Sequence, residues 1–257
     1  MNTCIYTTSL ALGNAGGQAA AQLIREAINS NGSATIILAT GTSQFETLKE
    51  LVAAKNIDWS KVVMFHLDEY ISLPIMHPAS FRKYLQERFL SQVPQLKNAW
   101  LINGETDALQ ECKRLGDLIQ KHPVDVALIG IGENGHLAFN DPPADFATEE
   151  PYIIVELDDA CKKQQMGEGW FHSLDEVPRQ AISMSVQQML KSKNIICSVP
   201  GMRKASAIKN TLEKEVSNLY PSTILQAHNN CILYIDEDAA ATLSPATKEK
   251  ITCISNN

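Results

Sequence analysis

The sequence predicts an α/β protein in which helices cover both faces of a mainly parallel central sheet. Three observations support this fold class: short apolar runs recur along the chain, segments with a helical spacing of apolar residues lie between many of them, and the composition is even from end to end. Strands that alternate with helices favour a parallel sheet, and strands covered on both faces show little polar alternation. We therefore expect the 257 residues to form one domain, residues 1–257, around a continuous core.

The expected strands are apolar runs, most of them rich in β-branched residues, which suits burial on both faces. In chain order they are ATIILA (34–39), KVVMFHL (61–67), VDVALIG (124–130), YIIVEL (152–157), AISMSV (181–186), NIICSV (194–199) and CILYID (231–236). The expected helices carry apolar residues three and four positions apart. They are GQAAAQLIREAINS (17–30), FETLKELVAAK (45–55), SFRKYLQERFLSQV (80–93), ETDALQECKRLGDLIQKH (105–122) and RKASAIKNTLEK (203–214). Ligands of such sheets bind beyond the carboxyl ends of the strands, so the residues after each strand are the first candidates for a site.

Composition and charge exclude several classes of partner. The net charge of −7 leaves no basic stripe for a nucleic-acid backbone. No stretch reaches the roughly 18 uncharged apolar residues that span a membrane, and the first residues lack the pattern of a signal peptide. The six cysteines are scattered without a C-x-x-C pair, and no pair of histidines has a metal-ligand spacing. We expect a cytoplasmic protein with reduced thiols and no essential metal, which binds neither nucleic acid nor membrane.

The first expected strand of this series is followed by TGTSQ, which leads directly into the helix 45–55. The small residues among Thr40, Gly41, Thr42 and Ser43 let backbone amides point outward, and the helix N-terminus adds its positive end, so a phosphate would be held well. The alternative is an ordinary turn in which Ser43 caps the helix. The stretch is not a Walker A loop, because no Gly-Lys-Ser or Gly-Lys-Thr follows.

The next strand ends in FHLDEY, where two carboxylates are adjacent. Side chains next to each other in an extended segment point in different directions. Asp68 or Glu69 is therefore free to enter a pocket while the other accepts hydrogen bonds from nearby backbone. A simple loop cap is the alternative, and the position at a strand end favours a functional role.

The stretch IGENGHLAFNDPP follows the third strand, and Gly130, Gly132 and Gly135 have the spacing of a dinucleotide-binding turn. Such a turn must open a helix, and the two prolines that end the stretch stop any helix. The glycines are better explained as a tight turn that brings His136 and Asp141 over the sheet. Histidine is the side chain best able to exchange a proton near neutral pH.

The segment VPGMRKA places Arg203 and Lys204 at the start of the helix that follows the strand 194–199. Cations at a helix N-terminus oppose the helix dipole unless an anion is bound there. The pair therefore indicates an anion site, with a solvated basic pair as the alternative.

In combination, these motifs resemble those of glucosamine-6-phosphate deaminases, in the glucosamine/galactosamine-6-phosphate isomerase family. The stretches ATGTS, FHLDEY, LPIMHPASF, GIGENGHLAFNDP, AISMSV and VPGMRKA occur in the same order and spacing over nearly the whole chain. The resemblance implies a Rossmann-like three-layer sandwich, shared with 6-phosphogluconolactonases and ribose-5-phosphate isomerase. It implies isomerisation and deamination of glucosamine 6-phosphate to fructose 6-phosphate and ammonia, without a cofactor.

The resemblance also implies how the substrate phosphate and sugar are bound. Thr40, Gly41, Thr42 and Ser43 would line the sugar and phosphate site, and Lys204 would contact the phosphate. The expected partner is therefore a small sugar phosphate. Oligomeric state varies within the family, so a homo-oligomer remains open.

The catalytic roles follow from the same resemblance. Asp68 would move the proton from C2 to C1, His136 would open the sugar ring, and Asp141 would support that histidine. Asn134 stands where the family commonly has aspartate, and Asp141 stands where it usually has glutamate. The segment 158–171 lacks the family's phosphate-binding arginine, for which Lys162 or Lys163 is a candidate replacement.

Three other functions are weighed against this one. Galactosamine 6-phosphate is the nearest alternative substrate. A 6-phosphogluconolactonase-like hydrolase is disfavoured by AFNDP and LDEY, which differ from the lactonase pattern. A non-catalytic sugar-phosphate sensor is disfavoured because Asp68, His136 and Lys204 are all present.

Overall fold

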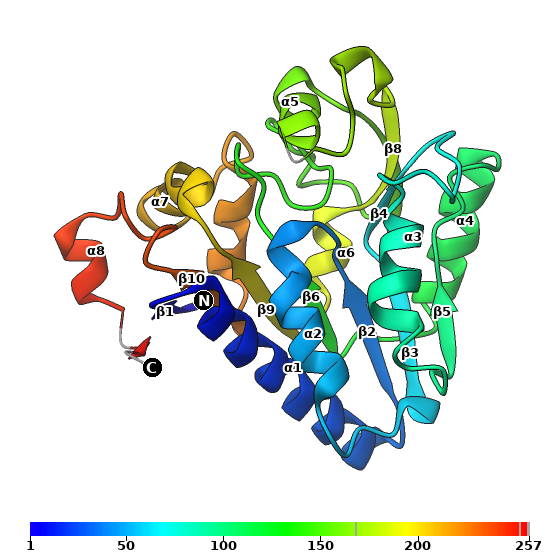
Figure 1. Cartoon of the computed structure of the whole chain (residues 1–257), viewed down its shortest axis with the longest axis horizontal. Helices are drawn as coiled ribbons and strands as arrows, with labels where there is room; N and C mark the ends of the chain where they lie inside the picture. The colour runs from blue at the N-terminus through cyan, green and yellow to red at the C-terminus, as the bar shows by residue number, and fades with distance from the viewer. Residues whose placement is uncertain (168, 252, 256–257) are drawn as a thin grey trace.

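The computed structural model describes residues 1–167, 169–251 and 253–255, and it confirms the predicted α/β fold class (Figure 1). Eight strands form one sheet in the order β11-β1-β10-β9-β6-β2-β3-β5, and each neighbouring pair is parallel. These strands are β1 (Asn2–Tyr6), β2 (Ala34–Leu38), β3 (Val62–His66), β5 (Asn98–Trp100), β6 (Val126–Ile129), β9 (Asn194–Val199), β10 (Cys231–Asp236) and β11 (Cys253–Ser255).

The strand order reverses between β2 and β6. From β2 the chain proceeds outward to β3 and β5, and it then returns to β6 and proceeds the other way to β9 and β10. In sheets of this kind the two connections diverge at such a switch point and leave a crevice beyond the carboxyl ends of the two strands. The topology alone therefore places a ligand site after β2 and β6.

Helices cover both faces of this sheet. The described helices are α1 (Ser9–Asn31), α2 (Phe45–Ala53), α3 (Phe81–Leu85), α4 (Ala108–Ile119), α5 (Asp159–Gly167), α6 (Val186–Leu190), α7 (Ala205–Glu213) and α8 (Pro245–Glu249). Short helical turns are η1 (Thr42–Gln44), η2 (Trp59–Lys61), η3 (Gln86–Leu90), η4 (Leu174–Glu176), η5 (Met202–Lys204) and η6 (Pro221–Ala227).

Strand β2 shows why four of its five residues are apolar. All five of its residues are buried. Ile37 belongs to a cluster with residues of α4, α6 and α7, whereas Ile36 and Leu38 belong to a second cluster with residues of α1, α2 and α3. Because successive side chains of a strand point to opposite faces, the two clusters lie on opposite sides of the sheet.

Two of the predicted strands do not join the parallel sheet. The segments 152–157 and 181–186 correspond to β7 (Tyr152–Glu156) and β8 (Gln180–Met184), which pair antiparallel with each other. Together with β4 (Asp68–Tyr70) they form a smaller sheet in the order β4-β8-β7. An apolar run predicts a buried strand but does not reveal its partner or direction, so this sheet was not predictable from periodicity.

The helix predicted over 17–30 begins eight residues earlier, at Ser9. The Thr8 hydroxyl caps it by accepting a hydrogen bond from the Ala11 amide at 3.1 Å. Glycines in the first turns lower the helix propensity of this segment, so its start at Ser9 was not predicted. They serve packing instead, since a Cβ atom on Gly13 would lie 2.3 Å from the Cβ atom of Glu46 on α2. The helices α5, α6 and α8 and the strands β1, β4, β5 and β11 were also not predicted.

No helix in the part of the chain that the structure describes is both long and apolar enough to cross a membrane. The cytoplasmic location inferred from the sequence stays a prediction.

Candidate active site

A cavity opens at the switch point of the large sheet, beyond β2 and β6. It brings together most of the residues that the sequence singled out, including Asp68, His136 and Lys204. Its lining is Ala39, Thr40, Gly41, Thr42, Ser43, Leu67, Asp68, Phe81, Gly130, Ile131, Gly132, His136, Ala138, Phe139, Gln164, Gln165 and Lys204. Helix α5, at the top of the view in Figure 1, contributes the two glutamines.

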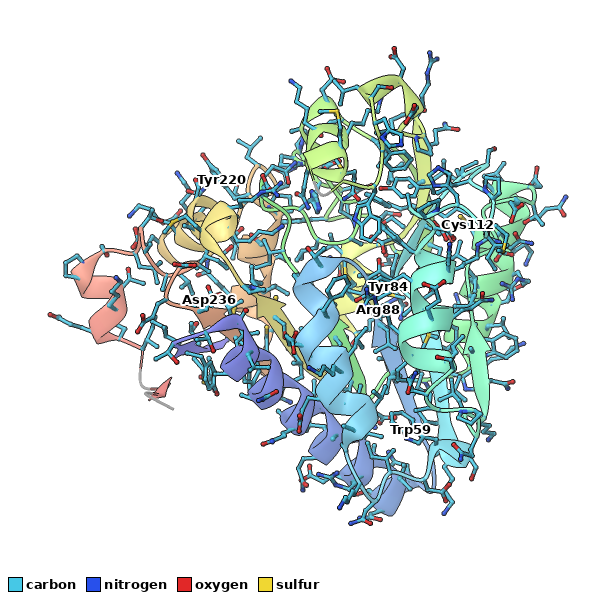
Figure 2. All side chains as sticks on the ribbon, viewed as in Figure 1. Trp59, Tyr84, Arg88, Cys112, Tyr220 and Asp236 are labelled. Atoms are coloured by element: carbon cyan, nitrogen blue, oxygen red, sulfur yellow. The ribbon has the colours of Figure 1, made fainter. Side chains whose placement is uncertain are left out.

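The loop after β2 lines the cavity and is held by hydrogen bonds to other segments. Gly41 has a φ of 96° and precedes the turn η1 and helix α2, and its carbonyl accepts a hydrogen bond from the Tyr84 hydroxyl at 3.0 Å. The buried Gln44 amide donates to the carbonyls of Ile129 and Ser198, at the ends of β6 and β9, at 3.4 and 3.1 Å. Tyr84 is packed beside Arg88, as Figure 2 shows. The phosphate-binding loop predicted from the sequence is therefore preorganised at a helix N-terminus.

Lys204 reaches the cavity from a second turn of the same kind. It lies in η5, after β9, where Gly201 precedes the turn with a φ of 95°. Asp236 at the end of β10, labelled in Figure 2, fixes this turn because both of its carboxylate oxygens accept from the Gly201 amide, at 2.9 and 3.0 Å. The turns after β2 and β9 thus direct two helix N-termini and one lysine toward the same space, which suits an anion.

Asp68 and Glu69 diverge in the way that the sequence predicted. Asp68 lines the cavity, whereas Glu69 is fully buried and turned away from it. Glu69 accepts hydrogen bonds from the amides of Tyr70 and Arg82 at 2.9 and 2.8 Å and from the Ser80 hydroxyl at 2.9 Å. Burial, and then the neighbouring charge of Glu69, raises the pKa of Asp68 to about 8.

His136 is oriented by a carboxylate and an amide behind it. Its Nδ1 atom lies 2.9 Å from Asp141 Oδ1, and both side chains are 8% exposed. Asn134 Nδ2 donates to the same Asp141 oxygen at 3.0 Å, and Asn134 Oδ1 accepts from the His136 amide at 3.1 Å. Burial raises the pKa of Asp141, but the hydrogen bonds from His136 and Asn134 and the histidine charge outweigh it, so the pKa is lowered. Asp141 and Asn134 thus contact His136 or its backbone and are not part of the cavity lining.

Glycine is required at position 132 because the His136 imidazole packs directly against it. A Cβ atom on Gly132 would lie 2.2 Å from His136 Nε2, so only glycine leaves room for the imidazole. Between β6 and β7 the described chain contains no helix, which agrees with the interpretation that these glycines do not open a dinucleotide-binding helix.

Strand β8 of the small sheet fixes the two candidate proton-transfer groups relative to each other. Asp68 on β4 pairs with Ser183 on β8. The Ser183 hydroxyl also accepts hydrogen bonds from the Phe139 amide and from Asn140 Nδ2, at 3.1 and 3.2 Å, in the segment that follows His136. One residue therefore links the strand of Asp68 to the loop of His136.

Two glutamines of α5 were missed by sequence reasoning. Gln164 Oε1 accepts from the Glu133 amide at 2.9 Å, and Gln165 Oε1 is buried with no hydrogen-bond partner among the described residues. Lys162 and Lys163, suggested as replacements for the absent arginine, do not line the cavity. The only sequence signal was an amide pair in a polar segment, which is equally typical of a solvated helix.

The arrangement suits proton transfer on a bound anionic molecule. Helix N-termini and Lys204 would hold the anion, Asp68 is a carboxyl group poised to gain or lose a proton near neutral pH, and His136 is a second proton carrier with a fixed orientation. Beside the cavity, His136 and Asp141 also lie close to Cys161, and these three side chains have the chemistry to bind a metal.

Comparison with known proteins places this geometry in a family. Residues 7–234 match the family described as glucosamine-6-phosphate isomerases/6-phosphogluconolactonase. The chain belongs to this family. The resemblance predicted from the motifs is thereby confirmed.

Members of the family with curated names support the assignment over most of the chain. A glucosamine-6-phosphate deaminase from Lactococcus lactis subsp. cremoris (strain SK11) is 37% identical over 232 residues, covering 89% of this chain and 95% of the relative. One from Bacillus cereus (strain B4264) is 33% identical over 251 residues, covering 97% of this chain and 92% of the relative.

Solved structures of the family share the fold. One described as a monomeric glucosamine-6-phosphate deaminase has a TM-score of 0.84 and 29% identity, and it covers 94% of this chain and 99% of its own. A 6-phosphogluconolactonase from Shewanella baltica OS155 has a TM-score of 0.76 at 19% identity, covers 92% of this chain and 97% of its own, and shows the fold alone.

Proposed function

We propose that this protein is a glucosamine-6-phosphate deaminase, which converts glucosamine 6-phosphate and water to fructose 6-phosphate and ammonia. The observation that carries the proposal is the convergence of Asp68, His136 and the Thr40–Ser43 and Lys204 anion site on one cavity. The named relatives act on this substrate and cover most of the chain, which supports the same assignment. The partner is accordingly a small sugar phosphate.

The first step is opening of the sugar ring. Because His136 Nδ1 faces Asp141, its Nε2 is the nitrogen left to carry a proton between the anomeric hydroxyl and the ring oxygen. Asp141 holds the ring orientation and stabilises the imidazolium that forms during transfer. The amide of Asn134 fixes Asp141 in turn.

The second step moves a proton between adjacent carbons. Asp68 as the carboxylate takes the proton from C2 of the open-chain amino sugar and returns it to C1, through an enolamine. The resulting C2 imine adds water and releases ammonia, which leaves the ketose. Anchoring the phosphate at the far end places both carbons within reach of a single carboxylate.

A substrate panel tests the proposal directly. Purified protein with glucosamine 6-phosphate is expected to release ammonia and fructose 6-phosphate in equal amounts, and galactosamine 6-phosphate tests the epimer. Lactone hydrolysis above the spontaneous rate would favour the lactonase alternative. Tight binding of the sugar phosphates without any product would favour a sensor.

Lys204→Gln is expected to raise KM for glucosamine 6-phosphate roughly 10–100-fold, because a charge-assisted hydrogen bond contributes about 1.5–3 kcal/mol. Lys209→Gln is the matched control, since Lys209 lies on the adjoining helix α7, is 43% exposed and pairs with Glu213. Steady-state kinetics on both variants checks the prediction. Equal KM values in the two variants would contradict phosphate binding by Lys204.

Asn134→Asp is expected to lower kcat/KM roughly 10–100-fold, since it removes a donor to a carboxylate and places two negative charges together. The amide now lies 3.0 Å from Asp141 Oδ1. Asn134→Ala loses the donor without adding charge, so its kcat/KM should lie between those of the wild type and Asn134→Asp. An Asn134→Asp enzyme as fast as the wild type would show that the amide does not support the histidine.

A further inference from the structure

We propose that His136, Asp141 and Cys161 form an inhibitory site for a thiophilic divalent cation such as Zn²⁺. One ligand atom from each of these side chains lies within 4.8 Å of the other two. The three residues come from the glycine loop, the segment that follows it and helix α5, so the fold assembles the cluster from separate parts of the chain.

A second observation indicates that the cluster has unused ligand capacity. Asp141 Oδ2 is buried, in a side chain that is only 8% exposed, and the carboxylate has the weakly donating thiol of Cys161 beside it. Cys161 is 1% exposed, and its thiol has no part in the proposed reaction. A thiol is a weak donor and leaves a buried carboxylate poorly compensated, and a cation is the natural way to compensate its charge.

The donor set selects the class of metal. One sulfur, one imidazole nitrogen and one carboxylate oxygen are the ligands that Zn²⁺ uses, whereas Mg²⁺ and Ca²⁺ require oxygen ligands. Zinc bonds of about 2.0–2.3 Å place tetrahedral ligand atoms roughly 3.6 Å apart, so the ligand atoms that lie farthest from each other must draw together by up to about 1 Å. Three protein ligands leave a fourth position for water.

The resting thiol does not compete with the proposed deamination. Burial, followed by the nearby charge of Asp141, raises the pKa of Cys161 well above its usual range, so the thiol stays protonated beside Asp141. A cation at the site would displace that proton, because metal ligation requires the thiolate.

Metal binding would inhibit the enzyme because one of the ligands is the imidazole of His136, the proposed proton carrier. Its Nδ1 atom is the one that Asp141 now orients. A metal bound there would take the place of this partner and hold the imidazole, so the ring could no longer cycle between its protonation states. This consequence rests on the proposed function, whereas metal binding itself does not.

Calorimetry with the full-length protein tests binding without reference to activity. We expect one Zn²⁺ per chain, at least tenfold weaker binding in Cys161→Ser, and unchanged binding in Cys112→Ser, which removes a thiol outside the cluster. Cd²⁺ should give a thiolate charge-transfer band in the wild type and Cys112→Ser but not in Cys161→Ser. Asp141→Asn, which weakens the oxygen ligand, should also bind Zn²⁺ less tightly, and it serves as the second variant should Cys161→Ser fail to fold.

Measurements of enzyme activity with added Zn²⁺ distinguish inhibition from binding alone. Zn²⁺ is expected to stop ammonia release by the wild type and by Cys112→Ser, with recovery on adding a chelator, while Cys161→Ser stays active at the same concentration. Mg²⁺ should neither bind nor inhibit. Wild-type affinity for Zn²⁺ in Cys161→Ser would overturn the site, and equal inhibition of that variant would overturn its inhibitory role. If no sugar phosphate proves to be a substrate, the calorimetric and Cd²⁺ results still decide whether the metal site exists.

Discussion

Replacement of Asp68 by asparagine is expected to lower kcat for glucosamine 6-phosphate roughly 10²–10⁴-fold, the range typical of removing a general base. The amide would keep the size of the side chain in the cavity but could not accept the C2 proton. The decisive readout is solvent-deuterium incorporation into the sugar, which should vanish with turnover. Substrate that still exchanges at C2 in the variant would remove Asp68 from its proposed role.

The same substitution is expected to stabilise the fold. Burial raises the pKa of Asp68 from 3.8 to about 8, so the folded protein holds a proton that the unfolded chain releases. The stability associated with this proton is fully present below pH 3.8 and is lost as the pH rises through about 8. At high pH the wild type therefore carries a buried charge that the variant lacks.

Urea unfolding at two pH values measures this effect. The free energy of unfolding of Asp68→Asn should exceed that of the wild type by about 0.5–2 kcal/mol, as is common when an active-site strain is relieved. The difference should be larger at pH 9 than at pH 6. For the wild type, kcat/KM should rise with pH toward about 8, as Asp68 loses its proton in the free enzyme. A difference in unfolding free energy that does not depend on pH would contradict the raised pKa.

Much of the candidate site was predictable from the sequence, because a residue that follows a parallel strand has a known place at the carboxyl edge of the sheet. Thr40 follows β2, His136 follows β6 and Lys204 follows β9, and neighbouring parallel strands bring their carboxyl ends to one edge of a sheet. It was likewise predictable that one of the adjacent carboxylates, Asp68 or Glu69, would enter a pocket while the other accepted hydrogen bonds from nearby backbone. For these residues, the position relative to the preceding strand was sufficient for the prediction.

The remaining features depend on contacts between distant segments. Ser183 links the strand of Asp68 to the loop of His136 only because β8 runs antiparallel to β4, and no periodicity encodes that pairing. Gln165 becomes part of the cavity only because α5 lies beside the glycine loop, where the neighbouring Gln164 accepts from the Glu133 amide. The role of Asn134 also could not be decided, because its amide has both a donor and an acceptor, and only the structure shows that each is used.

The small sheet helps to hold Asp68 in a fixed position relative to the large sheet. Its strand β4 begins at Asp68, and only Leu67 separates it from the end of β3 at His66 in the large sheet. The Leu67 amide donates to Leu38 of β2 at 3.2 Å, and its carbonyl accepts from Met184 of β8 at 2.9 Å. The junction therefore ties the strand that begins at Asp68 to β2 on one side and to β8 on the other.

Glu69→Ala is expected to lower the free energy of unfolding by about 3–5 kcal/mol, the cost of removing one partner of a buried ion pair. Glu69 is fully buried, and its Oε2 atom lies 3.4 Å from Arg82 Nε, in a side chain that is itself 6% exposed. The carboxylate also accepts from the amides at the start of α3, so its loss leaves both a cation and backbone donors without this partner. Because Glu69 adjoins Asp68, kcat should fall as well.

Glu105→Ala provides the matched control, because Glu105 binds the same guanidinium at 2.8 Å but is 41% exposed. Exposed ion pairs contribute little, so this variant should lose no more than about 1 kcal/mol and keep its activity. Urea unfolding of both variants, with kcat measured at a temperature where each is folded, separates stability from catalysis. If the two variants lose similar amounts of unfolding free energy, burial is not what makes Glu69 important, and the network would have to act through Arg82 alone.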